Sequence, residues 1–251
     1  MRPLQTDLSG FYRIDFERPP VGIKFQFFKP QDIDPLSMDK NLSFCEMLAE
    51  AQVADAPFYF SKEHNETCVG KILLGMDDME PFAEAGEIGP RLGIMQESRV
   101  NHNFYHHVPR LAKGTVNYVV FTPINKLTFE PDVVIITATP KQAEIVMRAM
   151  SYSTGVPYTS KTTMVMGCSW IYIYPFETGN VNYLMPEMIH GMTGRELFAP
   201  NTVLVSIPYQ WLQTVAQNLK KIGLMFHETK DKYLAEFEGI IIDLVGRSKK
   251  P

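Results

Sequence analysis

The stretch PDVVIITATPKQ at residues 131–142 decides how this chain is expected to fold. Residues 132–137 are apolar almost throughout, which is typical of a β-strand covered on both faces. Thr139 then suits a helix N-cap, Pro140 suits the first helical position, and Gln142 completes a capping box. A helix is therefore predicted from Pro140 to about Tyr152. A buried strand that runs directly into a capped helix indicates a domain built from both kinds of element.

The rest of the chain carries the same mixture of signals. Ser43 and Glu46 form a second capping box, and Pro208 opens another helix, for which Gly223 is the expected stop. A last helix or strand is expected over residues 233–245. Strands and helices alternate without a regular βαβ count, so an α+β fold is predicted, with a mixed α/β fold as the alternative. The other predicted elements are strands at residues 20–28, 116–121 and 202–207 and a helix at residues 43–53.

An approximate internal repeat has a spacing of one hundred residues. Pro57 and Pro157 are each followed by an aromatic residue and, eleven places beyond the proline, by Cys68 and Cys168. Each block follows a predicted helix, and each helix follows a strand that opens on proline. The order strand, helix, Pro-aromatic, cysteine thus occurs twice, either through an old duplication or by coincidence.

If the repeat is a duplication, two pseudo-repeated strand–helix–cysteine halves pack into one compact unit. The first half would span residues 1–112 and contain Cys45 and Cys68, and the second would span residues 113–251 and contain Cys168. Cys68 and Cys168 would then occupy equivalent places and face each other across a pseudo-twofold axis.

Composition and charge exclude several classes of protein. The net charge is −4, which argues against a basic face for nucleic acid. No run of 18 or more apolar residues is present, so no membrane span is expected. Residues 1–20 contain acids and prolines where a secretory signal would need apolar residues. We therefore expect a cytoplasmic protein.

The three cysteines are the main candidates for chemistry. An odd number in a reducing compartment argues against a disulfide framework. Cys45 falls at the second position of its helix, where unpaired N–H groups and the helix dipole favour a thiolate. Thr67 similarly caps a turn that begins at Cys68. Cys168 precedes residues 169–174, where propensity favours a strand and the repeat favours a helix; we expect the helix.

Three thiolates near helix starts suit an iron–sulfur cluster or another soft metal, with Cys45, Cys68 and Cys168 as ligands. Two alternatives remain. In one, the protein is a metal-free small-molecule enzyme or sensor that uses Cys45 as a reactive thiol. In the other, it is a structural or interaction protein, such as a homodimer, with inert buried cysteines. The sequence assigns no catalytic residue and leaves open whether the protein is an enzyme.

A Gly-rich segment supplies a second candidate site. Gly191 and Gly194 allow the backbone to approach a ligand closely, and Arg195 follows them with a cation. An anionic small molecule is the expected ligand, and a plain turn is the alternative.

Several short motifs resemble the uncharacterised family known as domain of unknown function 169, over about residues 19–222. The resemblance implies a cytoplasmic protein without an assigned activity. It also implies a shared site at Cys45, Cys68 and Cys168 and a Gly-rich stretch that ends in Arg195, but it implies no reaction. The motifs are Pro20-Val-Gly-Ile-Lys-Phe, Ser43-Phe-Cys45, Thr67-Cys68-Val-Gly, Pro131-Asp-Val-Val-Ile-Ile, Gly167-Cys168 and Ser206-Ile-Pro208.

Overall fold

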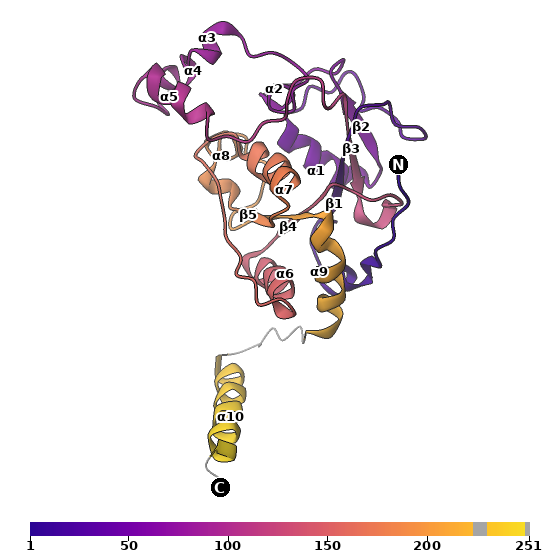
Figure 1. Cartoon of the computed structure of the whole chain (residues 1–251), viewed down its shortest axis with the longest axis vertical. Helices are drawn as coiled ribbons and strands as arrows, with labels where there is room; N and C mark the ends of the chain where they lie inside the picture. The colour runs from indigo at the N-terminus through magenta and orange to yellow at the C-terminus, as the bar shows by residue number, and fades with distance from the viewer. Residues whose placement is uncertain (223–229, 249–251) are drawn as a thin grey trace. The chain divides into compact units, whose positions relative to one another are not determined.

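A computed structural model describes residues 1–222 and 230–248 of the chain (Figure 1). The chain divides into two compact units, Met1–Lys220 and Lys221–Pro251, which are considered separately below. The first unit contains a β-sheet and its covering helices. Among the helices of the described residues, none combines the length and the apolar character needed to cross a membrane.

The centre of the first unit is a six-stranded sheet in which every neighbouring pair of strands is antiparallel. Its order is β2-β3-β1-β4-β6-β5. Together with the helices, this sheet confirms the predicted α+β class. The strands are β1 (Val21–Gln26), β2 (Phe58–Ser61), β3 (Tyr118–Pro123), β4 (Val133–Ala138), β5 (Asn182–Leu184) and β6 (Val203–Pro208).

The two halves of the sheet mirror each other in strand order. The first three strands of the chain lie in the order β2-β3-β1, and the last three continue as β4-β6-β5, so β1 and β4 meet at the middle. A duplicated strand–helix–strand–strand unit would give this order. The duplication itself stays a prediction, and so does the division of the chain into halves at residues 112 and 113.

Helices cover the sheet and fill the connections. The longest helices of the first unit, α1, α6 and α9, each lie directly before or after a strand. The second unit contributes one helix, α10 (Lys230–Ser248). The helices of the first unit are η1 (Leu8–Arg13), α1 (Phe44–Ala54), α2 (Gly70–Leu73), α3 (Pro81–Glu84), α4 (Ile88–Arg91), α5 (Ser98–Tyr105), η2 (Ile124–Lys126), α6 (Pro140–Tyr152), η3 (Ser169–Ile173), α7 (Tyr174–Thr178), η4 (Pro186–Met188), α8 (His190–Thr193) and α9 (Tyr209–Lys221).

The core that positions the cysteines lies on one face of the sheet. On this face α1 packs against β1 and β3, and η3 and α7 pack against β6. Phe44 of α1 and Tyr172 of η3 belong to one buried cluster with Ile23, Phe121 and Ile135 of the strands. Burial of such side chains supplies most of the stabilisation of a fold of this size. The first turn of α1 is thereby fixed against η3.

The opposite face is covered by α6 and α9 (Figure 1). Asn218 of α9 joins the two helices, because its side-chain amide donates to the Ala149 carbonyl of α6 at 2.8 Å. The segment η1 packs so closely on α9 that a Cβ atom at Gly10 would lie 2.0 Å from the Ala216 carbonyl oxygen. Glycine is therefore required at position 10.

The predicted elements largely agree with the structure. The helix predicted from Pro140 to about Tyr152 is α6, with both hydrogen bonds of its capping box. Residues 169–174, for which propensity favoured a strand, are helical, as the repeat argument expected. The last element is helix α10 rather than a strand. Gly223, the expected stop of the preceding helix, lies outside the described residues.

The capping box of α1 gives a first test. Ser43 Oγ accepts from the Glu46 N–H, and the Glu46 carboxylate accepts from the Ser43 N–H at 2.6 Å. We expect Ser43→Ala to lower the free energy of unfolding by about 1 kcal/mol, because it leaves an N–H of the first turn unpaired. Urea denaturation measures the change. Ser98→Ala, in the first turn of α5 where no side chain caps the helix, serves as a control and should change stability by less than about 0.5 kcal/mol. Equal effects of the two substitutions would contradict the role of the capping box.

Candidate functional site

The capping box places Cys45 at the second residue of α1. Ser43 ends the preceding extended segment, with φ −72° and ψ 161°, and the helix begins at Phe44. The side chain of Cys45 packs against the buried cluster but remains partly exposed. A reagent in solution can therefore reach this thiol.

Cys168 comes from a distant part of the chain and lies on the buried side of the same site. It directly precedes η3 and is 5 % exposed. Tyr172 ties this segment to α1, because its hydroxyl donates to the Phe44 carbonyl at 3.1 Å. The rings of Tyr172 and Phe44 also make an edge-to-face contact, with centroids 4.7 Å apart. Residues next to Cys45 and next to Cys168 are thus held together.

The two thiols lie close enough to influence each other. The pKa of Cys168 is raised well above its usual value, first by a hydrogen bond with Cys45, then by burial, and then by the charges of Cys45 and Glu66. Each of these effects favours the protonated thiol at Cys168. Burial also raises the pKa of Tyr172, and the charges of Cys45 and Cys168 raise it further. The site therefore pairs a partly exposed sulfur with a buried, protonated one.

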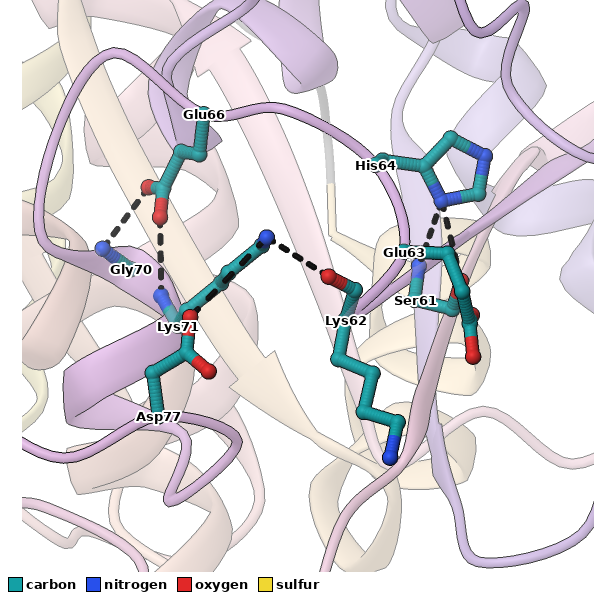
Figure 2. A network of polar contacts seen from close by, with 8 residues as sticks. All are labelled: Ser61, Lys62, Glu63, His64, Glu66, Gly70, Lys71 and Asp77. Carbon is teal, nitrogen blue, oxygen red and sulfur yellow. Dashed lines mark hydrogen bonds and ion pairs between the residues drawn. The ribbon is translucent and has the colours of Figure 1, made fainter.

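A partly buried carboxylate accompanies the thiol pair. Glu66 Oε1 accepts from the Gly70 N–H at 2.7 Å and Oε2 accepts from the Lys71 N–H at 2.9 Å, so the carboxylate caps α2 from outside the helix (Figure 2). Burial raises the pKa of Glu66, while the two backbone hydrogen bonds act against this shift. Cys168 lies close enough for the charge of Glu66 to raise the pKa of its thiol.

The chain around Glu66 is held by further polar contacts (Figure 2). The ammonium group of Lys71 donates to the Lys62 carbonyl at 2.7 Å and lies 3.9 Å from the Asp77 carboxylate. His64 Nδ1 accepts from the Ser61 N–H at 3.0 Å. These contacts fix the loop between β2 and α2, and with it the position of the Glu66 side chain.

Cys68 lies in the same loop, on the outer side of the site. Although the residue is exposed, enough protein surrounds its thiol that loss of solvation raises its pKa to about 11. The charges of Cys168 and Glu66 raise this pKa further, and the Arg195 guanidinium acts in the opposite direction. Cys68 is therefore a third thiol near Cys168, and the structure favours its protonated form.

Arg195 connects the loop of Cys68 to the helix of Cys45. Its guanidinium donates to the Thr67 carbonyl at 2.9 Å, to Thr67 Oγ1 at 3.0 Å and to the Glu46 carboxylate at 3.3 Å. Gly191 belongs to α8 and Gly194 is its C-cap. A Cβ atom at Gly191 would meet open space. Arg195 thus already has protein partners, and a ligand site at Gly191, Gly194 and Arg195 stays a prediction.

The prediction of an iron–sulfur cluster or soft metal held by Cys45, Cys68 and Cys168 is wrong. Within residues 1–222 and 230–248, no group of three or more His, Cys, Asp or Glu side chains is arranged to hold a metal ion. The three cysteines also differ in their surroundings, since Cys168 is buried, Cys45 is partly exposed and Cys68 is exposed. The alternative of three inert, buried cysteines is also wrong, since only Cys168 is buried.

Sequence reasoning missed Glu66 and Tyr172. Glu66 lies two residues before Cys68, but nothing in the local pattern indicates that its carboxylate turns inward to cap α2 and approach Cys168. Tyr172 lies in an aromatic run that is typical of a strand. Only the helical course of η3 directs its hydroxyl to the Phe44 carbonyl.

Comparison with known proteins gives one match. The model of the family DUF169, described as "Uncharacterised ArCR", matches residues 12–218. No curated protein and no solved structure matches the chain.

The contacts of Arg195 generate a second test. We expect Arg195→Met to lower the free energy of unfolding by about 1 kcal/mol, because it removes hydrogen bonds to Thr67 and Glu46. The amides of residues 66–71 should also exchange with solvent faster, which hydrogen–deuterium exchange measures. Arg148→Met, which breaks an exposed i,i+4 pair with Glu144, is the matched control and should leave these amides unchanged. Unaltered exchange in Arg195→Met would show that this contact does not hold the loop.

The raised pKa of Cys68 generates a third test. In the folded protein the rate of alkylation at Cys68 should rise about tenfold per pH unit until the pH approaches 11, whereas in denaturant it should level off near pH 8.5. Mass spectrometry after brief iodoacetamide treatment measures both profiles. Because the native state keeps this proton after the unfolded chain has lost it, Cys68 favours folding below about pH 8.5, and this contribution declines as the pH rises to 11. A folded-state plateau near pH 8.5 would disprove the shift.

Proposed function

The chain belongs to the DUF169 family, an uncharacterised family, and from the geometry of its thiol site we propose that it is a thiol–disulfide redox protein. The observation that carries the proposal is the proximity of Cys45 and Cys168. Cys45 directly follows Phe44, which contacts Tyr172 in the segment after Cys168, and the Cys45 thiol has the largest influence on the pKa of the Cys168 thiol. Two cysteines that lie near each other in the reduced protein can form a disulfide if their Cα and Cβ atoms come within the distances that the bond requires. This differs from the expectation that Cys45 acts alone.

The two thiols have different roles in the proposed reaction. Cys45 is partly exposed, so it is the sulfur that attacks a disulfide of an oxidised partner after losing its proton to solvent. Its attack breaks the partner's S–S bond, forms a mixed disulfide and releases the first partner sulfur as a thiolate. Cys168, buried behind Cys45, is placed to complete the exchange.

In the second step Cys168 attacks the Cys45 sulfur of the mixed disulfide. This forms the Cys45–Cys168 disulfide and releases the second partner sulfur, so two electrons pass from the protein to the partner. Cys168 must first lose a proton that its surroundings retain. Glu66 is the partly buried carboxylate whose charge reaches Cys168, and its raised pKa makes it a stronger base than an exposed glutamate. Glu66 therefore accepts the proton of Cys168.

Cys68 is not required for this exchange. Its raised pKa of about 11 makes it a poor nucleophile at neutral pH. It provides a third cysteine, and its substitution separates a specific disulfide from general oxidation.

The proposal predicts which disulfide forms. After treatment of the folded protein with oxidised glutathione, proteolysis without reductant should yield one linked pair of peptides that contain Cys45 and Cys168. Intact mass spectrometry should show the loss of two hydrogen atoms. Cys68→Ser should keep this disulfide, whereas Cys45→Ser and Cys168→Ser should prevent it.

Glu66→Gln tests the proton acceptor. The amide oxygen can still accept one of the two backbone hydrogen bonds from the capped helix, but the side chain cannot take up the proton, so closure of the disulfide at pH 7 should slow by about tenfold or more. Circular dichroism checks that each variant is folded. A wild-type protein that stays reduced, or that links only Cys68, would refute the proposed function, and an unchanged closure rate in Glu66→Gln would remove the role of Glu66.

A further inference from the structure

A pocket of about 720 Å³ lies at the end of β1, separate from the thiol site. Residues 26–33, where the chain leaves β1, form one wall, and residues 126–129 after β3 form another. Ligand sites for small molecules commonly have volumes of about 300–1,000 Å³. The pocket is therefore large enough for an organic molecule.

One wall presents two aromatic rings to solvent. Phe27 is 54 % exposed and Phe28 is 79 % exposed, and their rings meet edge to face with centroids 5.2 Å apart. Asn117 anchors this wall, because its backbone N–H donates to the Gln26 carbonyl and its side-chain amide donates to the Phe27 carbonyl, both at 2.9 Å. Exposed rings on an anchored segment offer an apolar surface for a flat ligand.

Thr122 of β3 supplies a polar group without a partner. The residue lines the pocket and is fully buried, and its Oγ1 makes no hydrogen bond with any described residue. An unpaired buried hydroxyl costs about 1–3 kcal/mol, and buried polar groups are nearly always hydrogen-bonded. A ligand atom that reached this hydroxyl after a small shift of the residues covering it would remove that cost.

The charged residues of the lining favour an anion. The lining contains two lysines, Lys29 and Lys126, and one carboxylate, that of Asp32. The Lys126 ammonium lies 3.7 Å from the Asp55 carboxylate, but both side chains are about half exposed, so this pair is weak and Lys126 remains able to contact a ligand. Lys29 lies over the Tyr59 ring at 5.9 Å, at the edge of the same surface.

We propose that this pocket binds an organic anion with an aromatic or similarly flat apolar body. The body packs against Phe27 and Phe28, the anionic group lies between Lys29 and Lys126, and a polar atom of the ligand pairs with the Thr122 hydroxyl. The proposal uses none of the cysteines, so it stands or falls independently of the redox function.

Titration with the fluorescent probe 1-anilinonaphthalene-8-sulfonate tests the proposal on the full-length protein. We expect saturable binding of one probe molecule per chain. Thr122→Val keeps the side-chain shape and removes the hydroxyl, so it should weaken binding about three- to tenfold without lowering the Tm. Lys126→Gln should weaken binding by a similar factor and reduce its dependence on salt.

Matched controls separate the pocket from general effects. Ser206→Ala also removes a fully buried, unpaired hydroxyl, but Ser206 does not line the pocket, so probe affinity should be unchanged. Lys141→Gln removes a positive charge from α6 and should likewise have no effect. The neutral analogue N-phenyl-1-naphthylamine should bind at least threefold more weakly than the sulfonate. Binding that does not saturate, equal affinities in Thr122→Val and wild type, or equal affinities for the two probes would overturn the proposal.

Discussion

The contact between Phe44 and Tyr172 is the constraint on which the candidate site depends. One hydrogen bond and one ring contact join the first turn of α1 to η3, segments more than one hundred residues apart in the chain. Because Cys45 directly follows Phe44, this contact also brings Cys45 to Cys168. The surroundings are apolar on the side of Cys168 and open to solvent on the side of Cys45. Cys45 and Cys168 therefore differ in reactivity, although their side chains are identical.

Much of the fold follows from local sequence patterns. Local signals act over a few neighbouring positions, as in the apolar run at β4 and the capping residues of α6 and α1. These elements can therefore be predicted without the rest of the chain. Residues 169–173 show the opposite case. Their aromatic and β-branched side chains favour a strand, but the segment is buried on all sides among α1 and the sheet and is helical. Tertiary packing overrides propensity there.

The candidate site could be predicted only in part. The three cysteines were identifiable as single positions, and the helix start at Cys45 was correct in detail. The protonation of the thiols could not be predicted, because it depends on burial and on the charge of Glu66. Neither can be inferred from positions in the sequence. The metal hypothesis assumed that all three cysteines are thiolates. The structure instead places Cys68 and Cys168 in surroundings that raise the pKa of their thiols. Arg195, expected to meet a ligand, meets Thr67 and Glu46.

The π-helical course of η3 constrains how the length of this segment can change. A π-turn holds one residue more than an α-turn, so it behaves as a single inserted residue within a helix. Inserting a further residue between Cys168 and Tyr172 would rotate one side chain relative to the other by about 100°. The tyrosine and the sulfur would then no longer face α1 together. An insertion of one residue in this segment would therefore separate Cys45 from Cys168.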